Sequence, residues 1–274
     1  MVNPLNRCRD GLVVVAALGC LVSVHACAEI SSSTTSSAAS STTGSGNGNG
    51  SASGSGGGGP SGLSDARIRE VLSHLATEVV TPTYQEATDA ADALVTASKA
   101  LADEPTEENL KKAQQAWGEA LAAWQAAEVM QVGPAGSSEF VLGGEDLRDE
   151  VYSWPLTNAC RVDQEIVEGN YSGGTAFASE AINVRGYDAL EQLLFLATET
   201  NACSVKSPIN QSGSWDKIIG ELPSRRANYA STLSLLLAQQ IGDLHTQWTP
   251  AGGNWSETLA EAGTAKSVYM TAYG

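Results

Sequence analysis

Apolar residues recur every three or four positions along most of this 274-residue chain, which is the spacing of one face of an α-helix. The first such segment can be capped at Ser64-Asp65, and its stripe consists of Ile68, Val71, Leu72, Leu75 and Val79. Pro82 is expected to interrupt this helix, because proline lacks a backbone N–H and clashes with the preceding turn. The helical pattern resumes over residues 84–101.

A second long helix is predicted to start at Thr106, whose hydroxyl can cap it. Glu107 and Glu108 then occupy its first turn, where acidic side chains interact favourably with the helix dipole. The stripe of this helix ends before Gly133-Pro134 and consists of Leu110, Ala113, Trp117, Leu121, Trp124 and Glu128.

The remaining pattern is also helical. Residues 133–156 are expected to be irregular, followed by helices at 157–168 and 185–198 and by a long helix at about 215–248, broken near its start by Gly220 and Pro223. Alternating β-branched runs are essentially absent from the sequence, so we predict an all-α, up-and-down helical bundle. Residues 251–274 have the pattern of a new helical pair, the start of a second bundle or a tail that docks on the first.

The N-terminus has the pattern of an export signal. Arg7 and Arg9 precede an apolar run of residues 11–24, which is short for a membrane span. Val24-His25-Ala26-Cys27 resembles a bacterial lipobox, so we expect acylation at Cys27 and an anchor made of lipid alone. Cys20 is a weaker acylation candidate, and plain cleavage after Ala26 or Ala28 would release a secreted form.

Composition sets the domain boundaries and the compartment. We expect a signal peptide at 1–26, a Ser- and Gly-rich tether at 27–62, a helical bundle at 63–250 and the start of an incomplete second helical region at 251–274. The formal net charge of −16 argues against nucleic acid as a partner. Outside the signal region only Cys160 and Cys203 remain, and in an exported protein they are expected to form a disulfide.

Two carboxylates form the main candidate site. Asp188 and Glu191 lie three residues apart and therefore share one helix face, beside a stripe of Leu190, Leu193, Leu194 and Ala197 that should be core. Acids so close to an apolar face need a cation, a partner arginine or exposure at the edge of the stripe. An ion pair with Arg185 or Arg161 is the structural alternative to metal binding.

Several stretches, taken in order over about residues 65–262, resemble the imelysin family of bacterial envelope proteins. The stretches are 117–128, 152–155, 160–164, 185–191 and 226–229. The family signature Gly-x-His-x-x-Glu corresponds here to Gly186-Tyr187-Asp188-Ala189-Leu190-Glu191, with aspartate in place of histidine. The resemblance implies an exported helical protein, often iron-regulated, built from two related bundles of which the second is missing here.

The resemblance and the acids together predict a site for a hard cation, with iron favoured, or for a small ligand. Its expected ligands are Asp188 and Glu191, with Glu128 as a third carboxylate. The residues expected around them, from the motif and the pocket, are Gly186, Tyr187, Arg185, Trp124, Trp154, Arg161 and Asp163.

Three functional hypotheses follow. The first is an envelope protein, in the periplasm or at the outer membrane, that binds a cation for uptake and works with envelope transport components. The second is a metallopeptidase, the label that the family carries, although the chain has three histidines and no His-Glu-x-x-His motif. The third is a non-catalytic interaction protein that keeps the carboxylates as a structural network.

Overall fold

The computed structural model describes residues 64–141, 143–152, 157–196 and 198–262, and all regular secondary structure in these ranges is helical, as expected. The α-helices are α1 (Asp65–Leu75), α2 (Thr81–Asp103), α3 (Glu107–Ala127), α4 (Leu147–Tyr152), α5 (Ala159–Glu168), α6 (Gly186–Phe195), α7 (Pro208–Gln211), α8 (Ser214–Ile218), α9 (Leu222–Trp248) and α10 (Trp255–Ala262). A π-helical turn spans Ala76–Val80, and 3-10 turns span Gly133–Ala135, Asn170–Ser179, Ile182–Val184 and Ile219–Glu221.

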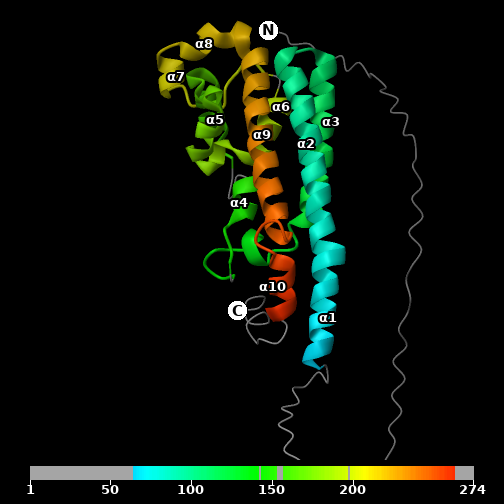
Figure 1. Ribbon diagram of the computed structural model, residues 1–274. Coiled ribbons are helices and arrows are strands. Elements are labelled where there is room, and N and C mark those ends of the chain that lie inside the picture. The colour runs from blue at the N-terminus through cyan, green and yellow to red at the C-terminus, as the bar shows by residue number, and fades with distance from the viewer. Residues whose placement is uncertain (1–63, 142, 153–156, 197, 263–274) are drawn as a thin grey trace, which may run out of the picture. The chain divides into compact units, whose positions relative to one another are not determined.

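Helices α2, α3 and α9 form the frame of the bundle, with α2 packed against both of the others (Figure 1). Small buried residues on α2 and α3, such as Ala87, Ala91 and Ala120, allow these helices to approach closely. Helix α6 packs against α3 and α9, and the short helices α4 and α5 contact it. The core therefore lies between the three long helices and α6.

The expected break at Pro82 was wrong, because the chain continues as a helix from α1 into α2. The π-helical turn Ala76–Val80 makes this possible: the Thr81 N–H bonds to the carbonyl of Ala76, five residues back. Proline normally clashes with the carbonyl four residues before it. A locally widened turn accommodates Pro82 just after this π segment, where it becomes an early residue of α2.

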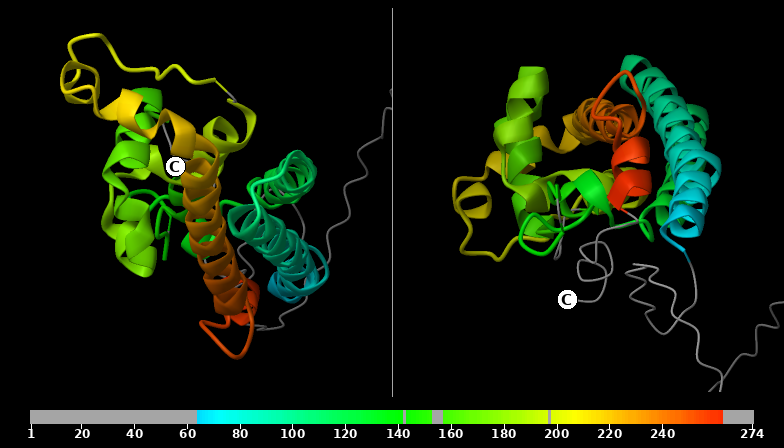
Figure 2. Two further views of the ribbon diagram at one scale, coloured as in Figure 1. Left: turned by 90° about the horizontal axis from the view of Figure 1, so that it is seen from above. Right: turned by 60° about the horizontal axis from the view of Figure 1, so that its bottom comes forward.

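The apolar stripe of the first helix is largely exposed, although Leu72 packs against the core. No residue of α1 is buried, and the exposed fractions of Val71, Leu75 and Val79 are 51%, 41% and 46%. Helix α1 packs on α10 (Figure 2, right), so the described part of the C-terminal region docks on the bundle. Residues 263–274 lie outside the described residues, as do the signal, the tether, Cys27 and Trp154.

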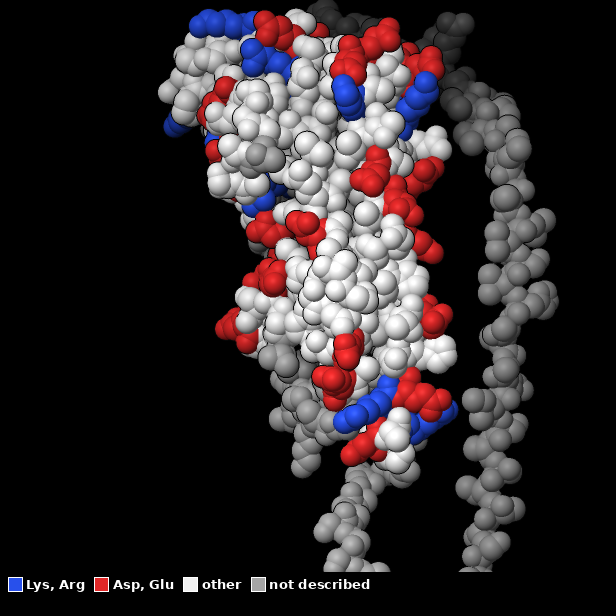
Figure 3. Space-filling view, viewed as in Figure 1, with Lys and Arg blue, Asp and Glu red and all other residues white. Residues whose placement is uncertain are grey.

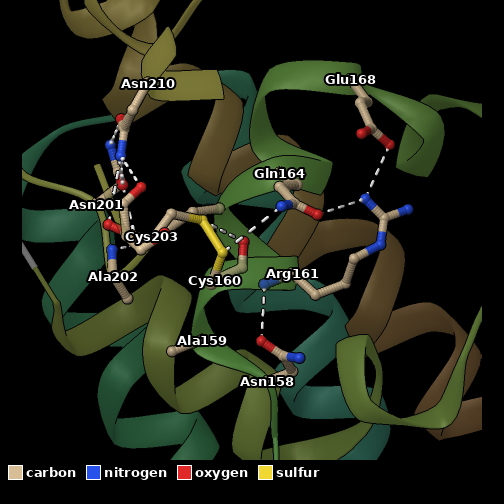
Figure 4. Close-up of a disulfide and its surroundings, with 12 residues drawn as sticks. Asn158, Ala159, Cys160, Arg161, Gln164, Glu168, Asn201, Ala202, Cys203 and Asn210 are labelled. Atoms are coloured by element: carbon tan, nitrogen blue, oxygen red, sulfur yellow. Dashed lines mark hydrogen bonds and ion pairs between the residues drawn. A yellow bond between two sulfur atoms is a disulfide. The ribbon is translucent and has the colours of Figure 1, made fainter. Parts of the chain in front are cut away.

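The predicted caps at Ser64 and Thr106 and the predicted disulfide are present. Each of these two side chains accepts a hydrogen bond from the backbone N–H three residues later, and Asn158, which was not predicted as a cap, does the same for α5. Cys160, on α5, is joined to Cys203 with their Cα atoms 4.5 Å apart (Figure 4). The disulfide therefore attaches α5 to the segment that precedes α7. Among the described helices, none is both long and apolar enough to cross a membrane.

Replacing both disulfide cysteines, Cys160→Ala with Cys203→Ala, should lower the free energy of unfolding by about 4 kcal/mol. The disulfide closes a loop of 43 residues, and its loss restores the chain entropy of the unfolded state. Urea unfolding of the double variant measures the change, with the reduced natural protein as a matched control. A loss below about 1 kcal/mol would show that the loop is held by its other contacts.

Candidate functional site

The signature stretch forms the start of α6. Gly186 is its first residue and has φ of +81°, a conformation that side-chain-bearing residues rarely adopt. Arg185 precedes it in an extended conformation. Leu190, Leu193 and Leu194 are buried, which confirms the predicted core stripe apart from Ala197, outside the described residues. Packing of this stripe fixes the direction in which the neighbouring carboxylates point.

Asp188 is half-buried, whereas Glu191, one turn further along α6, is exposed. Burial raises the pKa of the Asp188 carboxyl, and the negative charge of Glu191 raises it further. The two acids thus lie at the edge of the core and repel each other. This is a destabilising arrangement unless a positive charge compensates it.

The expected ion pair with Arg185 or Arg161 was wrong. Arg185 is buried and pairs with Glu150 of α4 at 2.9 Å, and Arg161 pairs with Glu165 and, at 3.0 Å, with Glu168. Within the described residues, no Lys, Arg or His forms an ion pair with Asp188 or Glu191. The nearby arginines are neutralised by other acids, which leaves the signature pair without a described cation.

Tyr152, at the end of α4, is near enough to two of the predicted carboxylates for both charges to act on its hydroxyl. Its pKa is raised by burial first, then by a hydrogen bond and the charge of Glu128, and also by the charge of Asp188. Glu128 caps the C-terminus of α3, and its carboxylate lies 3.8 Å from Nε of Arg148. The fold therefore brings Glu128 and Asp188 to the same tyrosine from different helices.

Aromatic side chains form the wall behind these acids. The Tyr152 ring lies 6.4 Å from the Trp124 ring and 6.5 Å from the Tyr187 ring, measured between centroids. The indole N–H of Trp117 donates to the carbonyl of Tyr187 at 3.1 Å and so joins α3 to α6. The buried Tyr187 hydroxyl and the Trp124 N–H have no hydrogen-bond partner among the described residues. Trp124 itself is therefore a core residue, while Trp117 and Leu121 of the same stripe are partly buried and pack against the core.

No group of three or more His, Cys, Asp or Glu side chains in the described ranges is arranged to hold a metal ion. Glu128, Asp188 and Glu191 thus do not form a preassembled three-ligand centre. The arrangement provides an oxygen-only, negatively charged surface with Asp188 and Glu191 on one helix and Glu128 across Tyr152. Metal binding by these residues stays a prediction.

Two residues predicted to line this site contact other groups. Arg161 neutralises acids of its own helix, and Asp163 accepts a hydrogen bond of 2.7 Å from the backbone N–H of Ala202. Sequence reasoning missed Tyr152 and Glu150 as members of the site. Tyr152 belongs to a stretch that carried the family resemblance, so a signal for it was available, but nothing in the sequence paired Glu150 with Arg185.

The sequence profile of the imelysin family, which carries a peptidase label, matches residues 80–273. The chain belongs to the imelysin family. An iron-regulated protein A from Synechococcus elongatus is 27% identical over 201 residues, covering 71% of this chain and 45% of that protein. A crystal structure from Parabacteroides distasonis, of a protein provisionally named an iron-regulated protein A precursor, matches with a TM-score of 0.53 and 19% identity.

That structural match covers 77% of this chain and 55% of the other, and it supports the fold alone. The imelysin-family chain described here therefore spans about half the length of the relatives it matches. In this chain the signature position that carries histidine in the family pattern is Asp188, a half-buried residue of α6.

Asp188→Asn should leave this imelysin-family protein as stable as the natural protein at pH 7, or more stable by up to about 1 kcal/mol. The folded state raises the pKa of Asp188, so the contribution of this carboxyl to stability is present below its ordinary pKa and is lost as pH rises through the raised value. The asparagine variant's advantage should therefore disappear on acidification below about pH 4.

Urea unfolding at pH 4 and pH 7 measures this difference, and Glu119→Gln, an exposed carboxylate of α3, provides the control. A loss of several kcal/mol at pH 7 would instead indicate that Asp188 neutralises a buried cation.

Proposed function

We propose that this protein is exported to the bacterial cell envelope, where it binds a hard cation, with iron favoured, or a small ligand that carries one, for uptake. The observation that carries this proposal is the uncompensated negative charge at the start of α6. Asp188 is half-buried, and its pKa is raised by burial and by Glu191. Among the described residues, no cationic side chain forms an ion pair with it.

A bound cation would remove the electrostatic cost of this arrangement. Placing a carboxylate at the edge of an apolar core is unfavourable, and a second carboxylate one turn away adds repulsion. A multivalent cation interacts favourably with both acids at once. Carboxylate oxygens are hard ligands, so the all-oxygen pair that results from aspartate in place of histidine favours hard cations over zinc.

The protein supplies only part of a coordination shell. Hard cations take about six or more oxygen ligands, whereas Asp188 and Glu191 provide two carboxylates and Glu128 contacts Tyr152 and Arg148. Water or a small chelating acid would fill the remaining positions. This favours recognition of a chelated ion over a resident metal, which agrees with a role in uptake.

The names of the relatives support an iron-related role, because both are called iron-regulated protein A. One is called a precursor, which agrees with the export signal pattern at the N-terminus of this chain. Acidic side chains are distributed over the visible face of the bundle, and its basic side chains lie mainly at the two ends (Figure 3). That distribution supports a cation over nucleic acid as the ligand.

Titration calorimetry of the purified protein with citrate-buffered ferric iron, calcium, manganese and zinc tests the proposal. We expect binding of a hard cation in preference to zinc, and a loss of affinity of at least about ten-fold in both Asp188→Asn and Glu191→Gln. Glu119→Gln, an exposed carboxylate on α3 outside the site, is the matched control. Binding that is equal in all four proteins, or absent from the folded natural protein, would contradict the proposal.

We further propose that Cys27 is acylated and anchors the protein by lipid. Metabolic labelling with a palmitate analogue should modify the natural protein and Cys20→Ser, because Cys27 occupies the lipobox position. Labelling should be lost in Cys27→Ser. Labelling that survives in Cys27→Ser would place the anchor elsewhere, and a secreted, unlabelled natural protein would exclude it.

A further inference from the structure

A small cavity of about 190 Å³, open to solvent and lined by both polar and apolar residues, lies beside the disulfide, separate from the signature acids. It is formed by α5, α6, α9 and the segment that follows α6. Its polar lining consists of Asp163, Gln192, Thr198, Thr200, Asn201 and Arg226. The volume exceeds that of one water molecule several times, since a water occupies about 30 Å³ of the liquid.

One wall carries a buried carboxylate. Asp163, on α5, is only 4% exposed, and its Oδ2 atom accepts the Ala202 N–H at 2.7 Å. The Oδ1 atom has only a long contact of 3.5 Å with the Gln192 amide. Burial raises the pKa of this carboxyl even though Ala202, Arg226 and Gln192 all act to lower it. One oxygen of the carboxylate is therefore poorly satisfied.

The opposite charge comes from α9. Arg226 donates from Nη2 to the carbonyl of Thr198 at 2.7 Å, which is its one hydrogen bond among the described residues. Burial lowers its pKa, and the charge of Asp163 partly offsets this effect. No ion pair within 4.0 Å joins these two described side chains, although both line the cavity. The two charges thus line the same cavity and act on each other without forming an ion pair.

The segment of residues 198–202 that lines the cavity is held by contacts of its own and of its neighbours. Cys203 is bonded to Cys160 of α5, and the Asn201 and Asn210 amides hydrogen-bond to each other at 2.8 and 3.2 Å (Figure 4). The indole N–H of Trp215 donates to the carbonyl of Glu199 at 2.7 Å. The cavity is consequently preorganised, which reduces the entropy that a ligand must offset on binding.

We propose that this cavity binds a small zwitterion of the α-amino acid class, with the ligand carboxylate on Arg226 and its ammonium group on Asp163. An arginine guanidinium can donate two parallel hydrogen bonds to a carboxylate, and an ammonium group supplies a shorter, charged donor to Oδ1 of Asp163 than the Gln192 amide at 3.5 Å. The hydroxyl and amide groups of Thr200 and Asn201 provide polar surroundings at the rim.

The same charges exclude other ligand classes. A metal cation at Asp163 would lie close to the Arg226 guanidinium, and an anion without an ammonium group would leave Asp163 unpaired in a buried place. A volume of about 190 Å³ is large enough for a free amino acid such as glycine or alanine. This site does not depend on the cation site proposed above, because it uses different residues.

Isothermal titration of the purified protein with glycine and L-alanine, and with acetate and methylammonium, tests the proposal. Both amino acids should bind, and each singly charged fragment should bind at least about ten-fold more weakly, because it leaves one charge of the protein unpaired. Arg226→Gln and Asp163→Asn should each lose at least about ten-fold in affinity. Arg225→Gln is the matched control, since Arg225 pairs with Glu221 and does not line the cavity.

Because Asp163 and Arg226 also hold backbone groups, a third variant separates ligand loss from misfolding. Ala202→Leu changes an exposed residue of the lining and fills the cavity without removing either charge. It should keep the circular dichroism spectrum of the natural protein and lose amino acid binding. The proposal is overturned if glycine and alanine fail to bind, if Ala202→Leu binds them normally, or if acetate alone binds as tightly.

Discussion

Burial of the leucine stripe of α6 is the constraint on which both candidate sites depend. With Leu190, Leu193 and Leu194 packed into the core, the rotation of α6 about its axis is fixed. Asp188 then lies at the edge of the core toward Tyr152, and Gln192 reaches α5, where it donates to the carbonyl of Ala159 at 2.9 Å. One apolar interface therefore positions the acids of the first site and a wall of the second.

The distribution of arginines explains why these sites carry unbalanced charge. Arg185 and Arg161 lie near the acids in sequence, but each pairs with a different carboxylate, Glu150 or Glu165. Ion pairs that are already formed hold α4 against α6 and stabilise α5. Two sets of charged side chains are left without an ion pair. One is the acidic surface at Asp188, and the other is Asp163 with Arg226, which line one cavity. Uncompensated charge in partly buried positions is typical of binding sites.

Local signals explain which parts of the fold could be predicted. A few neighbouring residues are enough to predict the caps at Ser64 and Thr106 and the broken start of α9 near Pro223. The pairing of Cys160 with Cys203 follows by elimination, because the other cysteines lie in the signal region. The predicted helix break at Pro82 was wrong, because a π-helical turn just before it accommodates a residue that has no backbone N–H. On α1 the periodicity indicated an apolar face but not what covers it, and that face is largely exposed.

The sequence by itself determined the all-α class, the starts of α1 and α3, the ends of α5 and α9, the disulfide and the position of the carboxylate pair on one face of α6. Only the tertiary structure decided which charges meet. It brought Tyr152 near both Glu128 and Asp188, and it placed Arg226 of α9 and Asp163 of α5 in the lining of one cavity. The physical reason is range: helix periodicity acts over a few residues, whereas ion pairs and cavities depend on how distant helices pack.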